Sequence, residues 1–262
     1  MKKIPVSDYH LYTEWAKKNT ANRVFPCSIT GGFQAGEICV DEDPAVEGDE
    51  ASEKKAVFFW HECGFGYISG NASEDFLNDI YDKMKSGGRR LILITRDDDI
   101  VAFFRAKEDI QLDTRLEYAY QPAETDTVCA ADPEFVIRQI SADNISGIKG
   151  RIVPSFSWES ADRFLKNGFG YLALDGDRIC AVAFSAAVSA DEVDIGIETH
   201  EDYRRRGLAA MLAKKMCEHI VRIGKRPVWA HAGANTGSMK TALKCGFVQT
   251  GTDTVIRVKK PD

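Results

Sequence analysis

The pattern of apolar positions in the C-terminal half changes once from a period of two to a helical period. Val or Ile occupies every second position in residues 192–198, which is typical of a strand with one buried face. From Leu208 to Ile223 the apolar side chains recur every three or four positions, as they do along an amphipathic helix. Gly224 then ends the run, as glycine commonly does at a helix C-terminus. The sequence therefore predicts a strand, a short polar loop and a helix.

Three arginines, Arg204, Arg205 and Arg206, lie in this loop directly before the helix. A helix start carries unpaired N–H groups and partial positive charge, so each cation there costs roughly 0.3–1 kcal/mol. An anion bound among the arginines and the backbone amides would reverse this cost. Gly207 and Ala209 keep the first turn small, which lets the backbone approach a ligand closely. The loop predicts a phosphate or pyrophosphate site; a solvated basic turn is the alternative.

The order R-x-x-G-x-A, from Arg204 to Ala209, matches neither G-x-x-x-x-G-K-[ST] nor G-x-G-x-x-G, so neither of those nucleotide-binding motifs is present. The surrounding pattern predicts further elements. Strands are expected at 135–140, 171–174, 179–188, 227–230 and 247–258, and helices at 143–148, 158–167 and 237–244.

These elements and motifs resemble the GNAT superfamily of acyl-CoA-dependent N-acyltransferases. The resemblance is carried by Arg204-x-x-Gly207-x-Ala209 after a strand, by Asn235-x-x-Ser238 at the start of the next helix, and by Lys244-x-Gly246-Phe247 at its end. It covers residues 135–258. The strand before the loop and the segment Phe156–Tyr171 are similar to the branch that contains the zwittermicin-resistance type of acetyltransferase.

The resemblance implies an α/β (α+β) fold with a mixed, mostly antiparallel sheet and flanking helices. This sheet would splay open between its fourth and fifth strands, with the thioester in the gap. Acetyl-CoA is the implied co-substrate, and no metal is implied. The residues implied to hold it are Ile197, Glu198, Thr199, Arg204, Arg205, Arg206, Gly207, Leu208, Ala209, Asn235, Ser238 and Lys244.

Acetyl transfer to an amine requires a proton acceptor, because an alkyl ammonium has a pKa near 10.4. Removing this proton is worth roughly 4–5 kcal/mol of barrier, so a catalytic base is expected. Glu198, at the end of the strand beside the loop, is the first candidate. His200 is the second and Asp194 the third. Without a catalytic role, Glu198 would be a solvated carboxylate or a partner of Arg204, and His200 a plain loop residue. The oxyanion would be held by a backbone N–H in 197–199.

One position departs from the family pattern. In many members a tyrosine seven residues after the asparagine protonates the leaving thiolate, but here this position is Ala242. Either another group, such as Ser238 or Tyr203, supplies the proton, or the thiolate leaves unaided. The predicted function is transfer of an acetyl group to a primary amine of a small molecule by direct attack in a ternary complex. A non-catalytic sensor that binds acyl-CoA is the alternative, and aminoacyl transfer from tRNA is disfavoured.

Composition narrows the class of protein further. The chain has 34 Lys and Arg against 40 Asp and Glu, a net charge of −6, which disfavours a general nucleic-acid binder. No apolar run approaches the ~18 residues that span a membrane, and Met1–Pro5 is not followed by the apolar segment of a signal peptide. Seven scattered cysteines without C-x-x-C indicate neither disulfides nor a metal site. A cytoplasmic enzyme without a membrane partner is expected.

The N-terminal half has no comparable motif. Helices are predicted at 9–18 and 73–85 and strands at 56–60, 66–69 and 91–94. The expected organisation is an accessory α/β domain at 1–120, a linker at 121–133 and an acetyltransferase domain at 134–262. The accessory domain would shape the acceptor pocket or form a homodimer contact. The similarity of Gly64–Tyr67 to Gly168–Tyr171 is interpreted as chance, because the chain has 21 glycines.

Overall fold

The computed structural model describes residues 1–19, 21–41, 55–121 and 134–259. It divides into two compact units, of which one is formed by Met1–Arg115 with Gly251–Asp262 and the other by Leu116–Thr250. Almost all of the predicted linker, residues 122–133, lies outside the described residues. The expected domain ranges stay a prediction, and the contacts assign the end of the chain to the N-terminal unit instead.

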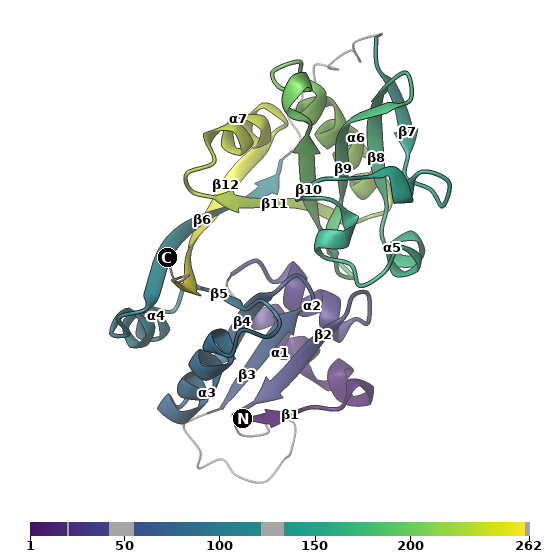
Figure 1. The fold of residues 1–262 in the computed structure, drawn as a ribbon. Coiled ribbons are helices and arrows are strands. Elements are labelled where there is room, and N and C mark those ends of the chain that lie inside the picture. Colours follow the sequence, from purple (N-terminus) through teal and green to yellow (C-terminus); the bar gives the residue numbers. More distant parts are fainter. Residues whose placement is uncertain (20, 42–54, 122–133, 260–262) are drawn as a thin grey trace. The chain divides into compact units, whose positions relative to one another are not determined.

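The C-terminal unit is a sheet with helices packed on it (Figure 1). Most of its strands are short and buried. Each helix begins after the alternating sequence pattern of a strand has ended. Its strands are β7 (Val136–Gln139), β8 (Gly170–Asp175), β9 (Arg178–Val188), β10 (Glu192–Thr199) and β11 (Arg226–Ala232). Its helices are α5 (Ala161–Asn167), α6 (Leu208–Arg222) and α7 (Thr236–Lys244), with 3-10 turns η2 (Ile145–Gly147), η3 (Pro154–Phe156) and η4 (Glu201–Tyr203).

The sheet of this unit opens between β10 and β11. The strands β7 to β10 are antiparallel neighbours, whereas β10 and β11 are parallel and pair only from Glu192–Arg226 to Asp194–Val228. Directly after Asp194 the register of β10 against β9 shifts at a β-bulge. The extra residue of this bulge lies in β9, and a bulge increases the local twist of the strand pair. Strand β10 stays paired with β9 to Thr199 while it leaves β11. The predicted splay between the fourth and fifth strands is confirmed.

Helix α6 covers β8 to β11 with the apolar face that its sequence periodicity predicts. The packed positions of α6 contain no run of β-branched residues. Gly224 follows the end of the helix at φ 74°, a left-handed conformation that favours glycine. Burial of this apolar face stabilises α6 far more than the helix propensity of its residues does. The buried residues are Leu208, Ala210, Leu212, Ala213, Met216, Cys217 and Ile220.

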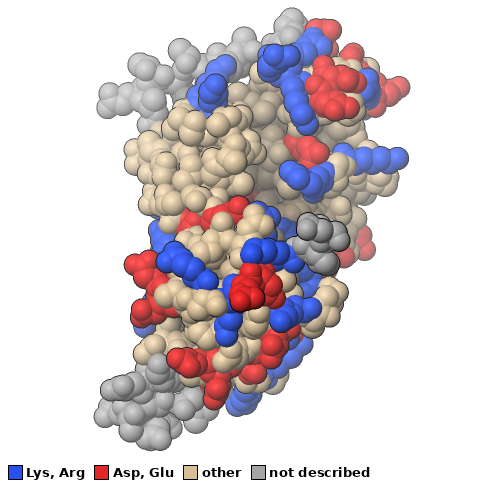
Figure 2. All heavy atoms as spheres, turned by 60° about the vertical axis from the view of Figure 1, so that its left-hand side comes forward, with Lys and Arg blue, Asp and Glu red and all other residues tan. Residues whose placement is uncertain are grey.

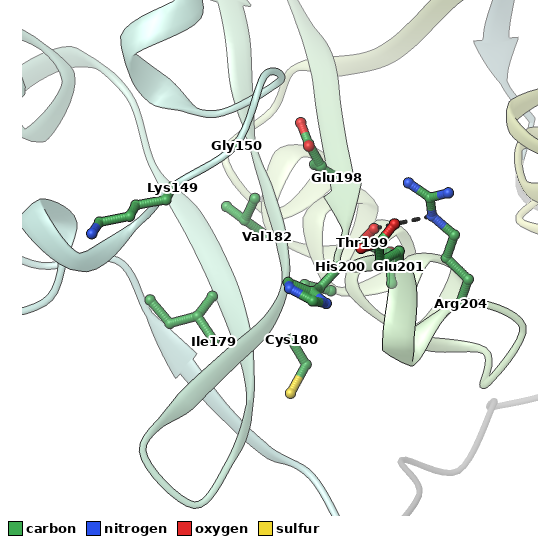
Figure 3. Close-up of a pocket in the computed structure, with 11 residues that line it drawn as sticks. Lys149, Gly150, Ile179, Cys180, Val182, Glu198, Thr199, His200, Glu201 and Arg204 are labelled. Atoms are coloured by element: carbon green, nitrogen blue, oxygen red, sulfur yellow. Dashed lines mark hydrogen bonds between the residues drawn. The ribbon is translucent and has the colours of Figure 1, made fainter.

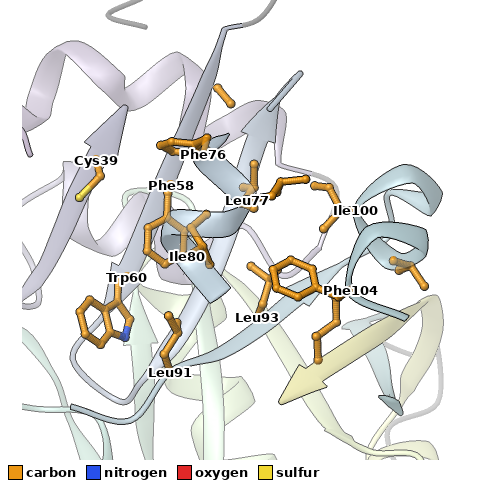
Figure 4. Close-up of a cluster of buried hydrophobic side chains, with 14 of the residues drawn as sticks. Cys39, Phe58, Trp60, Phe76, Leu77, Ile80, Leu91, Leu93, Ile100 and Phe104 are labelled. Carbon is orange, nitrogen blue, oxygen red and sulfur yellow. The ribbon is translucent and has the colours of Figure 1, made fainter. Parts of the chain in front are cut away.

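The N-terminal unit has the same order of strands and helices, except that two α-helices instead of one lie between its first and second strands. Its elements are β1 (Lys2–Lys3), η1 (Val6–Tyr12), α1 (Thr13–Lys18), α2 (Val24–Thr30), β2 (Gly36–Val40), β3 (Ala56–His61), β4 (Phe65–Gly70), α3 (Glu74–Lys85), β5 (Ile92–Thr95), α4 (Asp98–Arg105) and β6 (Ile110–Tyr120). The fourth and fifth strands, β4 and β5, are again parallel and pair only at Phe65–Ile92 and Gly66–Leu93. Figure 4 shows the core cluster, to which Phe58 of β3, Leu77 of α3 and Phe104 of α4 belong.

Two long strands contribute to both units. Strand β6 begins in the N-terminal unit and ends in the C-terminal unit, where it follows β11 in the strand order. Strand β12 (Phe247–Val258) does the reverse, and its Thr254–Ile256 pair with β5. Each fifth strand is therefore followed by a strand from the other half of the sequence. This exchange is the reason that the last residues belong to the N-terminal unit.

Several local expectations need correction. The predicted helix at 143–148 is only the 3-10 turn η2, and the helix expected from Trp158 begins at Ala161, after its cap Ser160. Helices α2 and α4 and strands β2 and β6 had no predicted counterpart. The segment Gly64–Tyr67 lies at the fourth strand of its unit and Gly168–Tyr171 at the second, so these similar tetrapeptides are not equivalent in the fold.

Two expectations about composition can be compared with the described residues. None of the described helices is long and apolar enough to cross a membrane. None of the described cysteines, at positions 27, 39, 63, 180, 217 and 245, is part of a disulfide, while Cys129 lies outside the described residues.

His61 makes the stability of the N-terminal unit depend on pH. Its ring is fully buried, and burial, with a smaller effect of Arg89, lowers the pKa of His61 from 6.5 to about 3. The unfolded chain binds this proton near pH 6.5 and the native state only near pH 3, so the free energy of unfolding falls as pH drops through that window. Between pH 7 and pH 4 the expected loss is about 3 kcal/mol.

A His61→Asn variant tests this expectation. The asparagine oxygen can replace Nδ1, which accepts a hydrogen bond from the Cys63 backbone N–H at 3.2 Å, but it does not titrate. Urea unfolding at pH 7 and pH 4 should give a smaller loss for the variant than for the wild type, although the variant is less stable at pH 7. Equal losses in the two proteins would contradict the assignment.

Candidate active site

The loop between β10 and α6 has the backbone of an anion-binding turn. Gly207 is the N-cap residue of α6, at φ 83°, and it offers no side chain to accept from the first turn. Arg205 has φ 65°, which costs a non-glycine residue roughly 1–2 kcal/mol. The first turn of α6 contains no acidic residue. The unpaired N–H groups of this helix start therefore point at a site without a protein carboxylate.

A cavity of about 450 Å³ lies at this helix start. It is formed by the end of β10, the arginine loop, the first turn of α6 and one face of α7. Its lining residues are Thr199, Tyr203, Arg204, Arg205, Gly207, Leu208, Ala209, Ala210, Gly237, Lys240, Thr241 and Lys244. We call it the loop pocket. Most of the residues predicted to hold the cofactor meet in this one place.

The three arginines have different surroundings. Arg204 and Arg205 line the loop pocket, and the Arg204 Nε donates to the Thr199 carbonyl at 3.4 Å. Arg206 instead forms an ion pair with Glu134 and its guanidinium lies 4.5 Å from the centre of the Phe135 ring. Arg206 thus anchors the start of β7 and does not line the loop pocket.

The Asn235-x-x-Ser238 motif has a structural role in α7. The Asn235 side chain caps the helix by accepting from the Ser238 backbone N–H at 3.0 Å, a common N-cap arrangement. The Ser238 hydroxyl accepts from the Trp229 Nε1 at 3.0 Å. Neither residue lines the loop pocket, and neither does Ile197. Lys240 and Thr241 do line it, although sequence reasoning missed them.

A second cavity of about 270 Å³ adjoins the loop pocket and shares Thr199 and Arg204 with it. We call it the carboxylate pocket. Figure 3 shows Glu198 on β10 between Lys149 on one side and Arg204 on the other. Its lining residues are Lys149, Gly150, Ile179, Cys180, Ala181, Val182, Glu198, Thr199, His200, Glu201 and Arg204.

The Glu198 side chain is held by a segment far away in the sequence. Its Oε2 accepts from the backbone N–H groups of Arg151, at 2.9 Å, and Ile152. Gly150 makes this approach possible, because a Cβ at that residue would lie 3.0 Å from the Glu198 carboxyl group. Among the described residues no hydrogen bond to Oε1 is found. One oxygen is therefore fixed, and the other can meet a ligand in the carboxylate pocket.

His200 and Asp194 are less suited to act as a base. The His200 Nδ1 accepts from the Asp202 backbone N–H at 3.3 Å and caps η4, while Nε2 lies 3.3 Å from an Arg178 Nη. Both ring nitrogens are thus engaged with neighbouring groups. Asp194 is 4% exposed and lies in the paired part of β10, between β9 and β11.

The candidates to replace the missing tyrosine are also constrained. Ala242 is fully buried. The Tyr203 hydroxyl donates to Asp175 at 2.8 Å, and this hydrogen bond is the main cause that raises the pKa of Tyr203 to about 12. A phenol with so high a pKa is a poor proton donor to a thiolate, because the conjugate thiol has a pKa of only about 8.5.

The equivalent helix start of the N-terminal unit is closed to anions. Helix α3 follows β4 as α6 follows β10. Its N-cap Ser73 donates from its backbone N–H, at 2.7 Å, and its hydroxyl, at 3.0 Å, to the carboxylate of Asp41. Glu74 and Asp75 occupy its first turn. These carboxylates interact favourably with the positive end of the helix dipole and would repel a phosphate. Of the two equivalent helices, only α6 can therefore receive an anion.

Among the described residues no group of three or more His, Cys, Asp or Glu side chains could hold a metal ion. The polar groups of the two pockets are instead cations, backbone amides and single carboxylates, a set that suits phosphates and amines.

Comparison with known proteins identifies the family of this chain. The family model described as GNAT acetyltransferase matches residues 17–255. The uncharacterized N-acetyltransferase YdfB of Bacillus subtilis (strain 168) is 26% identical over 211 residues, which cover 78% of this chain and 81% of that protein.

Two solved structures show the same fold. A GCN5-related N-acetyltransferase-like protein from Streptococcus suis 89/1591 has a TM-score of 0.73 at 18% identity, over 97% of this chain and 100% of that chain. A tandem GNAT protein from the clavulanic acid biosynthesis pathway has a TM-score of 0.63 at 10% identity, over 100% of this chain and 98% of that chain. With a family model that matches most of its length, the chain belongs to the GNAT acetyltransferase family.

Proposed function

We propose that the protein transfers the acetyl group of acetyl-CoA to a primary amine of a small molecule by direct attack in a ternary complex. The observation that carries this proposal is the junction of the two pockets. The anion-binding loop pocket and the carboxylate pocket with Glu198 share Thr199 and Arg204. A cofactor phosphate and an acceptor amine can therefore be bound side by side.

In the loop pocket the pyrophosphate of CoA would be held by the amides of the first turn of α6 and by Arg204 and Arg205. The thioester would extend into the gap between β10 and β11. Beyond Asp194 the edge of β10 that faces this gap is no longer paired with β11. An N–H group of this edge, in residues 197–199, would stabilise the oxyanion of the tetrahedral intermediate.

In the carboxylate pocket Glu198 would accept the proton of the ammonium group through Oε1. The N–H bonds from Arg151 and Ile152 to Oε2 keep the carboxylate in one orientation, which reduces the entropy that must be lost in the transition state. The leaving thiolate would depart without a tyrosine, since Ala242 stands at that position. No residue of the chain forms an acyl intermediate in this scheme.

The finer assignments rest on the sequence alone. The branch that contains the zwittermicin-resistance type of acetyltransferase stays a prediction based on Phe156–Tyr171 and the strand before the loop. A cytoplasmic location and a homodimer also stay predictions.

Release of free thiol from acetyl-CoA tests the proposal. With a panel of small primary amines, at least one amine should give steady thiol release above the rate without acceptor. A protein that binds CoA tightly but releases no thiol with any acceptor would be a sensor, and the proposed function would then be wrong.

A further inference from the structure

The loop pocket carries more positive charge than a pyrophosphate requires. Arg204 and Arg205 line it from the loop and Lys240 and Lys244 from α7, and its lining contains no Asp or Glu. The whole chain has a net charge of −6, and Figure 2 shows basic and acidic side chains interspersed over one face. The carboxylate pocket is also mixed, with Glu198 and Glu201 beside its cations. A lining whose charged residues are all basic is therefore a local feature that points to a polyanionic ligand.

The two lysines are placed at a cost to their own helix. Lys240 and Lys244 are four residues apart, and like charges at this spacing destabilise a helix by roughly 0.2–0.5 kcal/mol. Lys244, in the last turn, gains from the helix dipole, but Lys240 lies in the middle of α7. In the part of the chain that the structure describes, neither ammonium group has an ion-pair partner. Their arrangement is thus not explained by contacts within the protein.

The periodicity of α7 directs both lysines into the same pocket. Gly237, Lys240, Thr241 and Lys244 follow the spacing i, i+3, i+4 and i+7 and all line the loop pocket, so they form one helix face. The opposite face packs inward through Ala242. Gly237 keeps the start of the basic face open, because a Cβ there would meet only the Asn235 side chain at 3.6 Å.

We propose that Lys240 and Lys244 bind the 3′-phosphate of CoA and make the enzyme select CoA over dephospho-CoA. This inference rests on the proposed function. The pyrophosphate brings one negative charge on each phosphorus, which Arg204, Arg205 and the helix amides match. A phosphate monoester brings a further charge of about −1.5 to −2 at pH 7. The two lysines of α7 match this second anion in number and lie in the same pocket.

Calorimetric titration with CoA and with dephospho-CoA tests the inference. The wild type should bind CoA about tenfold more tightly, as expected for hydrogen bonds to a charged group. The double variant Lys240→Gln/Lys244→Gln should bind the two ligands equally, at the wild-type affinity for dephospho-CoA. A control that removes two charges outside both pockets, Lys166→Gln/Arg222→Gln, should keep the preference.

Three outcomes would overturn the inference. A wild type that binds both ligands equally, or a double variant that keeps the preference, excludes recognition of the 3′-phosphate by these lysines while the proposed function stands. Equal weakening of both ligands in the double variant shows an unselective charge effect and also overturns it. A wild type that binds neither ligand overturns the proposed function itself, and the inference with it.

Discussion

Replacing Gly207 by Glu should lower the affinity for CoA at least 100-fold and leave the fold intact. The new carboxylate would lie at the N-terminus of α6, where the pyrophosphate is expected, and would take its place among the amides. The backbone at φ 83° is also strained for any residue with a Cβ. A loss of about 3 kcal/mol, from charge repulsion and lost amide contacts, corresponds to roughly 100-fold in affinity. No atom lies within 4 Å of a Cβ built at Gly207, so the core is not disturbed.

Gly224 provides a matched control for this substitution. It lies beyond the other end of α6, has φ 74°, and likewise has open space around a Cβ. Gly224→Glu should lose a similar amount of stability in thermal unfolding but keep its affinity for CoA in calorimetric titration. Wild-type affinity in a folded Gly207→Glu protein would refute the assignment of the loop pocket.

Replacing Glu198 by Gln should lower kcat by roughly 100- to 10,000-fold, the range that general base catalysis contributes. Glutamine can still accept the N–H bonds of Arg151 and Ile152 through its oxygen, so the segment around Gly150 should keep its place. The amide cannot take up the proton of the ammonium group. The affinity for CoA should be unchanged, because Glu198 does not line the loop pocket.

Glu201→Gln is the matched control, since Glu201 lines the same carboxylate pocket and its replacement removes the same charge. Its kcat should stay close to that of the wild type. Steady-state kinetics of both variants, at saturating acetyl-CoA, separate the two roles. Equal losses in the two variants would indicate a general electrostatic effect of the pocket and would exclude Glu198 as the specific base.

The secondary structure of the C-terminal unit could be predicted because short segments of its sequence carry clear patterns. The change of period around Arg204–Ala209 identifies strand, loop and helix, and the structure has β10 and α6 within one residue of the predicted ends. The basic face of α7 could also have been predicted, since Lys240 and Thr241 lie at helical spacing from Gly237 and Lys244. The role of Arg206 could not be predicted, because its partner Glu134 lies 72 residues away in the sequence.

Two other features depend on contacts that no local pattern encodes. The carboxylate of Glu198 is fixed by amides 46 and 47 residues earlier in the chain. From the second strand onward the N-terminal unit has the same order of strands and α-helices as the C-terminal unit, but its helix start at Ser73 carries carboxylates where the other carries arginines. Without the anion-binding motif the repeated topology leaves no sequence signature, and the exchange of β6 and β12 hides the boundaries of both units.

In the proposed reaction an acetyl group moves directly from CoA to an amine, without an acylated form of the protein. Mass spectrometry after reaction with acetyl-CoA labelled in its acetyl carbons tests it most directly, using an acceptor that supports thiol release. We expect the label in an N-acetylated amine, in amounts equal to the free thiol, and an unlabelled protein. Thiol release without a labelled amine, or label retained on the protein as an intermediate, would contradict it.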